Sequence, residues 1–131
     1  MKVIYLAAPL GAATREGIEA NKARARRWIR WVYDHFDDVA VVADWIITCD
    51  VLDDFDPAHR ARGLRMNAAI IPRCDEFWMV GGRISNGMRG ELEIAVAAHR
   101  WVRDFTALGE EPPVGVPPEF AENTCKDGAD M

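Results

Sequence analysis

Residues 75–92 of the chain, DEFWMVGGRISNGMRGEL, contain a strand, a loop and the start of a helix in immediate succession. Residues 75–80 form the short apolar run that is typical of a buried strand. The glycine-containing loop 81–87 ends this run, and apolar side chains then recur with helical spacing over residues 88–100. The side chains that share one face of this helix are Met88, Leu92, Ala95, Val96 and His99. The stretch therefore predicts one strand–loop–helix unit, and similar units precede it.

The N-terminal part of the chain contains the first of these units. Residues 2–7 predict a buried strand, and the small residues after it, Ala8 among them, let a ligand approach the backbone. Residues 15–36 predict a long helix, and residues 39–43 predict a second buried strand. The apolar stripe of the helix consists of Ile18, Ala25, Ile29, Val32 and Phe36. Its basic side chains, interpreted as a solvated face, are Lys22, Arg24, Arg26, Arg27 and Arg30.

The middle of the chain is less regular. Residues 44–55 predict an irregular acidic segment. The pair Asp56–Pro57 is typical of a helix start, and a helix is expected over residues 57–73, ended or distorted by Pro72. Its inward-facing side chains are expected to be Leu64, Ala68 and Ile71. Residues 101–106 predict a fourth strand.

This alternation of strands and helices predicts an α/β fold with a parallel sheet, in which ligands bind at the carboxyl ends of the strands. Three segments therefore meet at one edge: residues 7–11, the segment from Asp44 onward, and the loop 81–87. We expect one domain over residues 1–108. Residues 109–131 are proline-rich and acidic, and they predict a poorly ordered extension that is draped over a neighbouring element.

The composition narrows the range of functions. The 131 residues suffice for one sizeable core, and the formal net charge of −5 does not favour binding to a nucleic-acid polymer. A local nest of N–H donors still suits a small anion. No apolar run predicts a membrane span, and the N-terminus does not look like a signal peptide. Because Cys49, Cys74 and Cys125 are widely spaced and outside any metal-binding motif, we expect no disulfide, no metal and a cytoplasmic location.

The loop before the last helix is the strongest candidate for a binding site. Ser85, Asn86 and Gly87 stand at the helix start, and Glu91 follows within about one turn. Backbone N–H groups at a helix start and a serine hydroxyl bind anions, and glycine allows close approach. These residues therefore either hold a phosphate or simply cap the helix, with Glu91 complementing the helix dipole. Two flanking arginines either meet that phosphate or lie at the surface: Arg83 and Arg89.

Three features occur together in this chain: the run Tyr5–Leu10 at the first strand, Asp75 at the start of the third strand, and the motif Ser85-x-Gly87-x-x-x-Glu91. In this combination the chain resembles the nucleoside 2-deoxyribosyltransferase superfamily, which includes nucleoside 5′-monophosphate N-glycosidases. It resembles the small phage and bacterial members in particular, over about residues 2–108. The resemblance implies a flavodoxin-like (Rossmann-like) three-layer sandwich with a parallel sheet of four or five strands. Asp75 itself is interpreted as a residue that orients the strand start.

The resemblance also implies a chemistry. The residue matching Glu91 is the nucleophile that attacks the anomeric carbon of a ribosyl or deoxyribosyl group and expels the base, and water or a second base resolves the glycosyl-enzyme. The residue matching Tyr5 orients that carboxylate. Serine at position 85 is typical of members that act on nucleotides, whereas members that act on free nucleosides carry an acid there, which would repel a phosphate. No cofactor is implied.

One position departs from the superfamily pattern. Characterised members have an Asp where Asn67 stands, and that Asp assists the leaving base. An amide cannot deliver a proton, although it can donate a hydrogen bond to the base. Asp44 is the nearest substitute by topology, and Trp45 beside it is a candidate for stacking on the base. In the simpler interpretation Asp44 is a turn residue.

Three functions therefore remain open. The first is cleavage or transfer of the N-glycosidic bond of a nucleoside 5′-monophosphate, and the second is non-catalytic nucleotide binding or sensing on the same fold. The third is an interaction module whose active part is the extension 109–131. The resemblance further implies a homodimer or larger homo-oligomer, for which Trp28 or Trp31, near the edge of the first helix's apolar stripe, is a candidate contact.

Overall fold

Four strands form one parallel sheet in the computed structural model, which describes residues 1–114 of the chain. The strands are β1 (Lys2–Ala7), β2 (Val39–Val42), β3 (Glu76–Met79) and β4 (Trp101–Asp104). Their order across the sheet is β2-β1-β3-β4, so that Tyr5 of β1 is paired with Val42 on one side and Phe77 on the other. β2 is added on one side of β1 and β3 on the other, so the strand order reverses between β1 and β3. Open α/β sheets bind ligands at the carboxyl edge beside such a switch point.

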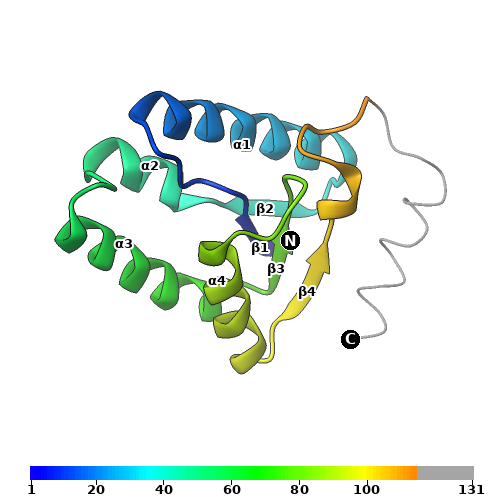
Figure 1. The fold of residues 1–131 in the computed structure, drawn as a ribbon. Helices are drawn as coiled ribbons and strands as arrows, with labels where there is room; N and C mark the ends of the chain where they lie inside the picture. Colours follow the sequence, from blue (N-terminus) through cyan, green and yellow to red (C-terminus); the bar gives the residue numbers. More distant parts are fainter. Residues whose placement is uncertain (115–131) are drawn as a thin grey trace.

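Helices cover both faces of this sheet (Figure 1). The α-helices are α1 (Arg15–His35), α2 (Asp44–Val51), α3 (Pro57–Ile70) and α4 (Asn86–Ala97), and two short 3-10 helices occupy Ile71–Arg73 and Thr106–Leu108. α1 lies across one face, whereas α4 packs against β3 and β4 on the other. α3 contacts both α4 and α2. These three layers confirm the predicted α/β, Rossmann-like sandwich, with four strands among the described residues.

Local hydrogen bonds fix where the elements start. The hydroxyl of Thr14 accepts a hydrogen bond of 3.0 Å from the backbone N–H of Gly17 and so caps α1. The carboxylate of Asp75 accepts a hydrogen bond of 2.8 Å from the backbone N–H of Val3, which ties the start of β3 to β1. This contact confirms the interpretation of Asp75 as an orienting residue.

One basic residue of α1 is not solvated as the sequence predicted. Lys22 lies within the buried stripe of α1, four residues after Ile18, and its side chain is almost completely buried. Its ammonium group forms ion pairs with the carboxylates of Asp50 and, at 2.7 Å, Glu19. The prediction was wrong for Lys22 because the helical pattern could not show that Asp50 comes close enough to compensate a buried charge.

The two tryptophans of α1 are also buried within the chain. Trp28 and Trp31 are both buried, and their rings meet edge to face at 5.4 Å. Trp31 also contacts the rings of Phe36 and Phe105, each at 5.9 Å. The expectation that one of these tryptophans remains for a partner subunit is therefore wrong.

Residues 44–55, predicted to be irregular, contain α2. This helix begins directly after β2, and the Thr48 hydroxyl donates a hydrogen bond of 3.1 Å to the carbonyl oxygen of Asp44. Ile47 and Val51 are exposed. An eight-residue helix with apolar side chains on its exposed side has no amphipathic period, and this explains why the sequence pattern did not indicate it.

The two later helices differ from the predictions in detail. α3 buries no residue completely, and Leu64, expected to face the core, is 47% exposed because it faces a cleft. Its regular part ends at Ile70, and Pro72 lies in the following 3-10 turn, as expected for a helix distorted by proline. α4 begins at Asn86 and ends at Ala97, and Val96, expected inward, is exposed.

The beginning of the predicted C-terminal extension packs against α1. The indole N–H of Trp28 donates a hydrogen bond of 2.9 Å to the carbonyl oxygen of Glu110. The carboxylate of Glu111 forms ion pairs with Arg24 at 2.7 Å and Arg27 at 2.8 Å. Gly82, with φ of +86°, lies so close to Glu110 that an added Cβ would be 2.8 Å from its backbone nitrogen. The rest of the predicted extension, residues 115–131, lies outside the described residues.

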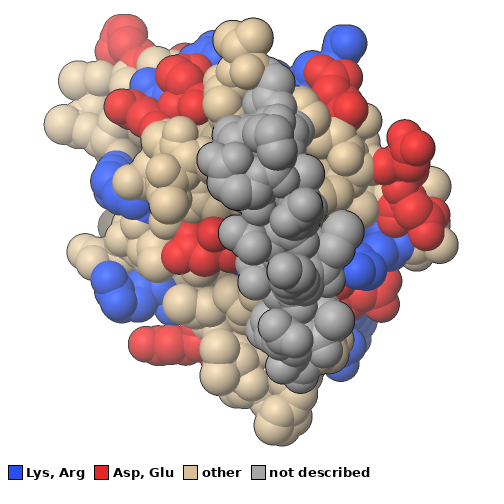
Figure 2. Space-filling model, turned by 90° about the vertical axis from the view of Figure 1, so that its right-hand side faces the viewer, with Lys and Arg blue, Asp and Glu red and all other residues tan. Residues whose placement is uncertain are grey.

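Charges of both signs are mixed on the face of the molecule that Figure 2 shows. On the face shown in Figure 2, acidic and basic side chains alternate among uncharged residues, and no continuous basic area is visible beside the grey region. No helix of residues 1–114 combines the length and the apolar composition that crossing a membrane requires.

Candidate functional site

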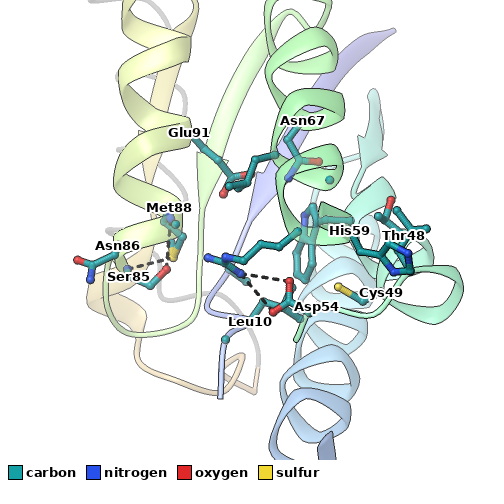
Figure 3. Close-up of a pocket in the computed structure, with 18 of the residues that line it drawn as sticks. Leu10, Thr48, Cys49, Asp54, His59, Asn67, Ser85, Asn86, Met88 and Glu91 are labelled. Carbon is teal, nitrogen blue, oxygen red and sulfur yellow. Dashed lines mark hydrogen bonds and ion pairs between the residues drawn. The ribbon is translucent and has the colours of Figure 1, made fainter. Parts of the chain in front are cut away.

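A cleft of about 310 Å³ opens at the carboxyl edge of the sheet, between the β3–α4 connection on one side and α2 with α3 on the other (Figure 3). Most of the predicted site residues line it. They are Ala8, Trp45, Asn67, Ser85, Asn86, Gly87 and Glu91. Tyr5 and Asp44 are not part of the lining, although both influence Glu91.

Tyr5 and Glu91 form the central contact of the site. The phenolic hydroxyl of Tyr5, which is completely buried, donates a hydrogen bond to Oε2 of Glu91. Burial raises the pKa of Glu91 to about 7, although the hydrogen bond from Tyr5 lowers it and the nearby charge of Asp44 adds to the increase. Burial and the charge of Glu91 raise the pKa of Tyr5 well above its usual range, so the phenol stays neutral and acts as a donor.

The sheet fixes the position of Tyr5. Its ring stacks on Phe77 of β3, with ring centroids 5.7 Å apart and planes inclined by 9°. Because β1 has hydrogen-bonded neighbours on both sides, the backbone that carries the phenol is fixed within the sheet. Glu91 lies on α4, five residues after the first residue of that helix. Since α4 follows β3, Glu91 reaches Tyr5 of β1 across the switch point between β1 and β3.

Asp44 lies behind this pair, as the first residue of α2. Its Oδ1 is buried and has no hydrogen-bond partner among the described residues. Burial raises the pKa of Asp44, and its charge in turn raises the pKa values of Tyr5 and Glu91. Asp44 is half-buried and does not line the cleft, so it acts on the site through its negative potential.

The sequence left two roles open for the start of α4, a helix cap and an anion-binding site, and the structure is compatible with both. The Ser85 hydroxyl accepts a hydrogen bond of 3.2 Å from the backbone N–H of Met88, so Ser85 does cap the helix. Ser85, Asn86 and Gly87 also line the cleft, as does Arg83, which has no ion-pair partner among residues 1–114. The first N–H groups of a helix lack acceptors within it. This end of the cleft therefore suits a small anion.

No steric contact within the described residues requires a glycine at position 87. A Cβ at this position would meet only the Ser85 hydroxyl oxygen, at 4.0 Å. The space in front of Gly87 is thus open to the cleft, which is the condition under which a ligand can approach the backbone closely.

Trp45 and Asn67 contribute in different ways. Trp45 donates a hydrogen bond of 2.9 Å from its indole to the carbonyl oxygen of Leu6 and is only 5% exposed, so little of its ring is available for stacking. Asn67 is half-buried on α3, and Figure 3 shows it on the wall that faces Glu91. Asn67 thus lines the cleft, and its role there stays a prediction.

Sequence reasoning missed most of the α2–α3 wall. We use this name for the residues Thr48, Cys49, Asp54, His59 and Arg60, which line the cleft opposite the start of α4. Hydrogen bonds and an ion pair anchor this wall: His59 Nδ1 accepts from the backbone N–H of Asp53 at 2.9 Å, and Arg60 pairs with Asp54 at 3.1 Å. The available signal was the helical spacing of Arg60, Leu64 and Asn67, which places them on one face of α3.

No group of three or more His, Cys, Asp or Glu side chains in residues 1–114 is arranged to hold a metal ion. The comparisons with known proteins give one result. A family model described as a domain of unknown function (DUF7768) matches residues 2–105, which include all the elements that build the cleft. No curated protein matches the chain.

Proposed function

This chain belongs to the family described as a domain of unknown function (DUF7768), and we propose that it cleaves or transfers the N-glycosidic bond of a nucleoside 5′-monophosphate. The observation that carries this proposal is the hydrogen bond from Tyr5 to Glu91 beside a cleft whose other end suits an anion. A half-buried, oriented carboxylate that lines a cleft is the kind of group that a glycosyl transfer requires at the anomeric carbon.

The reaction proceeds in two displacements. In the first, an oxygen of the Glu91 carboxylate bonds to the anomeric carbon, the C–N bond breaks, and the base departs with the bonding electron pair. In the second, water or another base attacks the same carbon and releases the carboxylate. Tyr5 holds Oε2 of Glu91, so Oε1 is the oxygen that attacks. Since the pKa of Glu91 is about 7, a large fraction of it is ionised near neutral pH.

The 5′-phosphate occupies the start of α4 in this proposal. The Ser85 hydroxyl and the N–H groups of Asn86 and Gly87 donate to it, and Arg83 supplies the opposite charge. Glu91 lies one to two turns further along the same helix, so the sugar lies between the phosphate and the α2–α3 wall. The base then faces that wall and the amide of Asn67.

The test is a panel of ribo- and deoxyribonucleoside 5′-monophosphates incubated with the full-length chain, with free base measured by chromatography. We expect base release from at least one nucleotide, much slower release from the matching nucleoside, and none from a Glu91→Gln variant prepared in parallel. Absence of base from every nucleotide at high protein concentration contradicts the proposal.

A second candidate function is nucleotide binding without turnover. It is favoured by Asn67, because an amide at the wall facing Glu91 cannot protonate a leaving base. Calorimetry separates the two functions: heat of nucleotide binding together with no base release in the assay above supports binding alone.

We also infer a cytoplasmic homodimer or larger homo-oligomer. The thiols of Cys49 and Cys74 are free, which suits a reducing compartment. The exposed apolar side chains of Ile47 and Val51 on α2 provide a contact surface in place of the buried tryptophans. Light scattering that gives a monomer mass at micromolar concentration contradicts the oligomer.

A further inference from the structure

Asp54 and Arg60 form an ion pair inside the cleft, on the α2–α3 wall (Figure 3). The guanidinium nitrogen Nη1 of Arg60 lies 3.1 Å from Oδ1 and 3.2 Å from Oδ2 of Asp54. The side chain of Asp54 is only 18% exposed, whereas that of Arg60 is 48% exposed. Both side chains line the cleft, and the guanidinium is the more exposed of the two groups.

The pair retains unused hydrogen-bonding capacity. A guanidinium has five N–H donors and no acceptor, and a carboxylate has about four acceptor sites and no donor. Only Nη1 of Arg60 is engaged, and Nε and Nη2 have no hydrogen-bond partner among residues 1–114. The wall thus presents free donors on Arg60 next to free acceptors on Asp54. Because the guanidinium can only donate and the carboxylate can only accept, a ligand must place its acceptor at Arg60 and its donor at Asp54.

The ion pair has no net charge, so this wall suits an uncharged ligand group with both a donor and an acceptor. Asp54 would repel a phosphate, and Ser85, which we place at the phosphate, lies on the opposite side of the cleft (Figure 3). In the proposed binding mode, with the phosphate at the start of α4 and the anomeric carbon at Glu91, the base lies against the wall that contains Asp54 and Arg60.

On the basis of the proposed function, we propose that Asp54 and Arg60 recognise the base, and that this base has a lactam edge, a carbonyl oxygen next to a ring N–H. Guanine, hypoxanthine and uracil have this edge. The ring N–H donates to the Asp54 carboxylate and the carbonyl accepts from Arg60, so both hydrogen bonds are charge-assisted. Adenine and cytosine present the reverse order, with an amino donor in place of the carbonyl and a ring-nitrogen acceptor in place of the N–H, so in the same pose neither group meets its complement on the wall.

The experiment measures binding to the full-length Glu91→Gln variant, which binds without turnover in the proposed mechanism. The probes are GMP, IMP and UMP against AMP and CMP, with ribose 5-phosphate as the probe that lacks a base. We expect the lactam nucleotides to bind at least about fivefold more tightly than the other two, as for one well-oriented base contact. Equal affinity for both groups overturns the inference, and this comparison needs no substitution in the wall.

Substitutions then test whether the Asp54–Arg60 pair causes the preference for lactam bases. Asp54→Asn supplies a donor as well as an acceptor, so it reduces the preference for lactam bases while leaving ribose 5-phosphate affinity unchanged. Arg60→Gln is expected to do the same, and Arg62→Gln, an exposed neighbour on α3 outside the cleft, is the matched control. A preference that survives in both wall variants overturns the assignment. Failure of every nucleotide and of ribose 5-phosphate to bind rejects the proposed function as well, whereas binding without discrimination rejects only the inference.

Discussion

Tyr5 and Glu91 lie 86 positions apart in the chain and share a hydrogen bond across the switch point of the sheet. The contact joins the central strand β1 to α4, so the orientation of the carboxylate depends on the register of the sheet as well as on the helix. The neutral phenol stabilises the ionised form of Glu91, while burial and Asp44 oppose it. The balance of these effects keeps the pKa of the carboxyl group close to neutral pH.

The first prediction concerns Glu91→Gln. Base release should be abolished, because the amide keeps the volume of the side chain but is not a nucleophile. Nucleotide affinity should stay within about twofold, since the phosphate contacts at Ser85 and Gly87 are untouched. Steady-state turnover and calorimetry provide the two measurements. Glu93→Gln, an exposed change on the same helix, is the control, and wild-type turnover by Glu91→Gln would refute the nucleophile assignment.

The second prediction concerns pH. Because the attacking group is the ionised carboxylate, kcat/KM should rise with pH and level off above a pKa of about 7. Tyr5→Phe removes the hydrogen bond that lowers this pKa, so the rising limb should move to higher pH. Tyr33→Phe, in which the lost hydroxyl only accepts from the backbone of Val41, should leave the profile unchanged. A profile that is identical in wild type and Tyr5→Phe contradicts the orienting role of Tyr5.

The third prediction is that Glu91 destabilises the fold when it is ionised. Its pKa is about 7 in the folded protein against an ordinary value of 4.5, so the folded state binds the proton more tightly than the unfolded chain. The cost therefore develops as pH rises from 4.5 to 7 and reaches about 3 kcal/mol above that window. Urea unfolding should show Glu91→Gln to be more stable than wild type at about pH 8 and equal to it at about pH 4. A difference that does not change with pH, as expected for Glu93→Gln, would contradict the burial of this charge.

The order of the strands and of the helices other than α2 was predictable, because it depends on local patterns. The apolar run at residues 75–80 and the helical spacing after it lie within one stretch of chain, and both correspond to observed elements. Ser85 at the start of α4 and Glu91 beyond it follow from the same local pattern. The pairing of Tyr5 with Glu91 came only from the family resemblance, since no local pattern links the two positions.

What could not be predicted depends on contacts between distant segments. Lys22 is buried because Asp50 approaches it from α2, a helix that has no amphipathic period of its own. Leu64 has the spacing of a core residue, yet it lines the cleft, because α3 stands at the edge of the sandwich rather than over its centre. The ion pair of Asp54 with Arg60 depends on how α2 and α3 are connected, and helical periodicity carries no information about that.

The fourth prediction concerns the segment that follows β4. Arg27 and Arg24 hold the pKa of Glu111 at about 2, so the folded state favours the ionised carboxylate. Its stabilising effect is present above the ordinary glutamate pKa of 4.5 and is lost as pH falls towards 2. Because Glu111 is half-exposed, the effect should be at most about 1 kcal/mol and should decrease with salt. Thermal unfolding should place Glu111→Gln below wild type at about pH 6 and level with it at about pH 2. An equal gap at both pH values would show that the ion pairs contribute nothing.

The last prediction separates the two roles of Ser85. Aspartate caps helices about as well as serine, so Ser85→Asp should keep the hydrogen bond to the N–H of Met88 and the stability of α4. The new negative charge lies where we place the 5′-phosphate, and the donating hydroxyl is lost. Nucleoside 5′-monophosphate affinity should therefore fall by about tenfold or more, while the affinity for the matching nucleoside should stay within about twofold. Thr14→Asp, the same kind of change at the cap of α1 and outside the cleft, is the control and should alter neither affinity. Calorimetry with each pair of ligands measures both effects. If Ser85→Asp binds the nucleotide as tightly as wild type, Ser85 is a helix cap only and the phosphate must lie elsewhere.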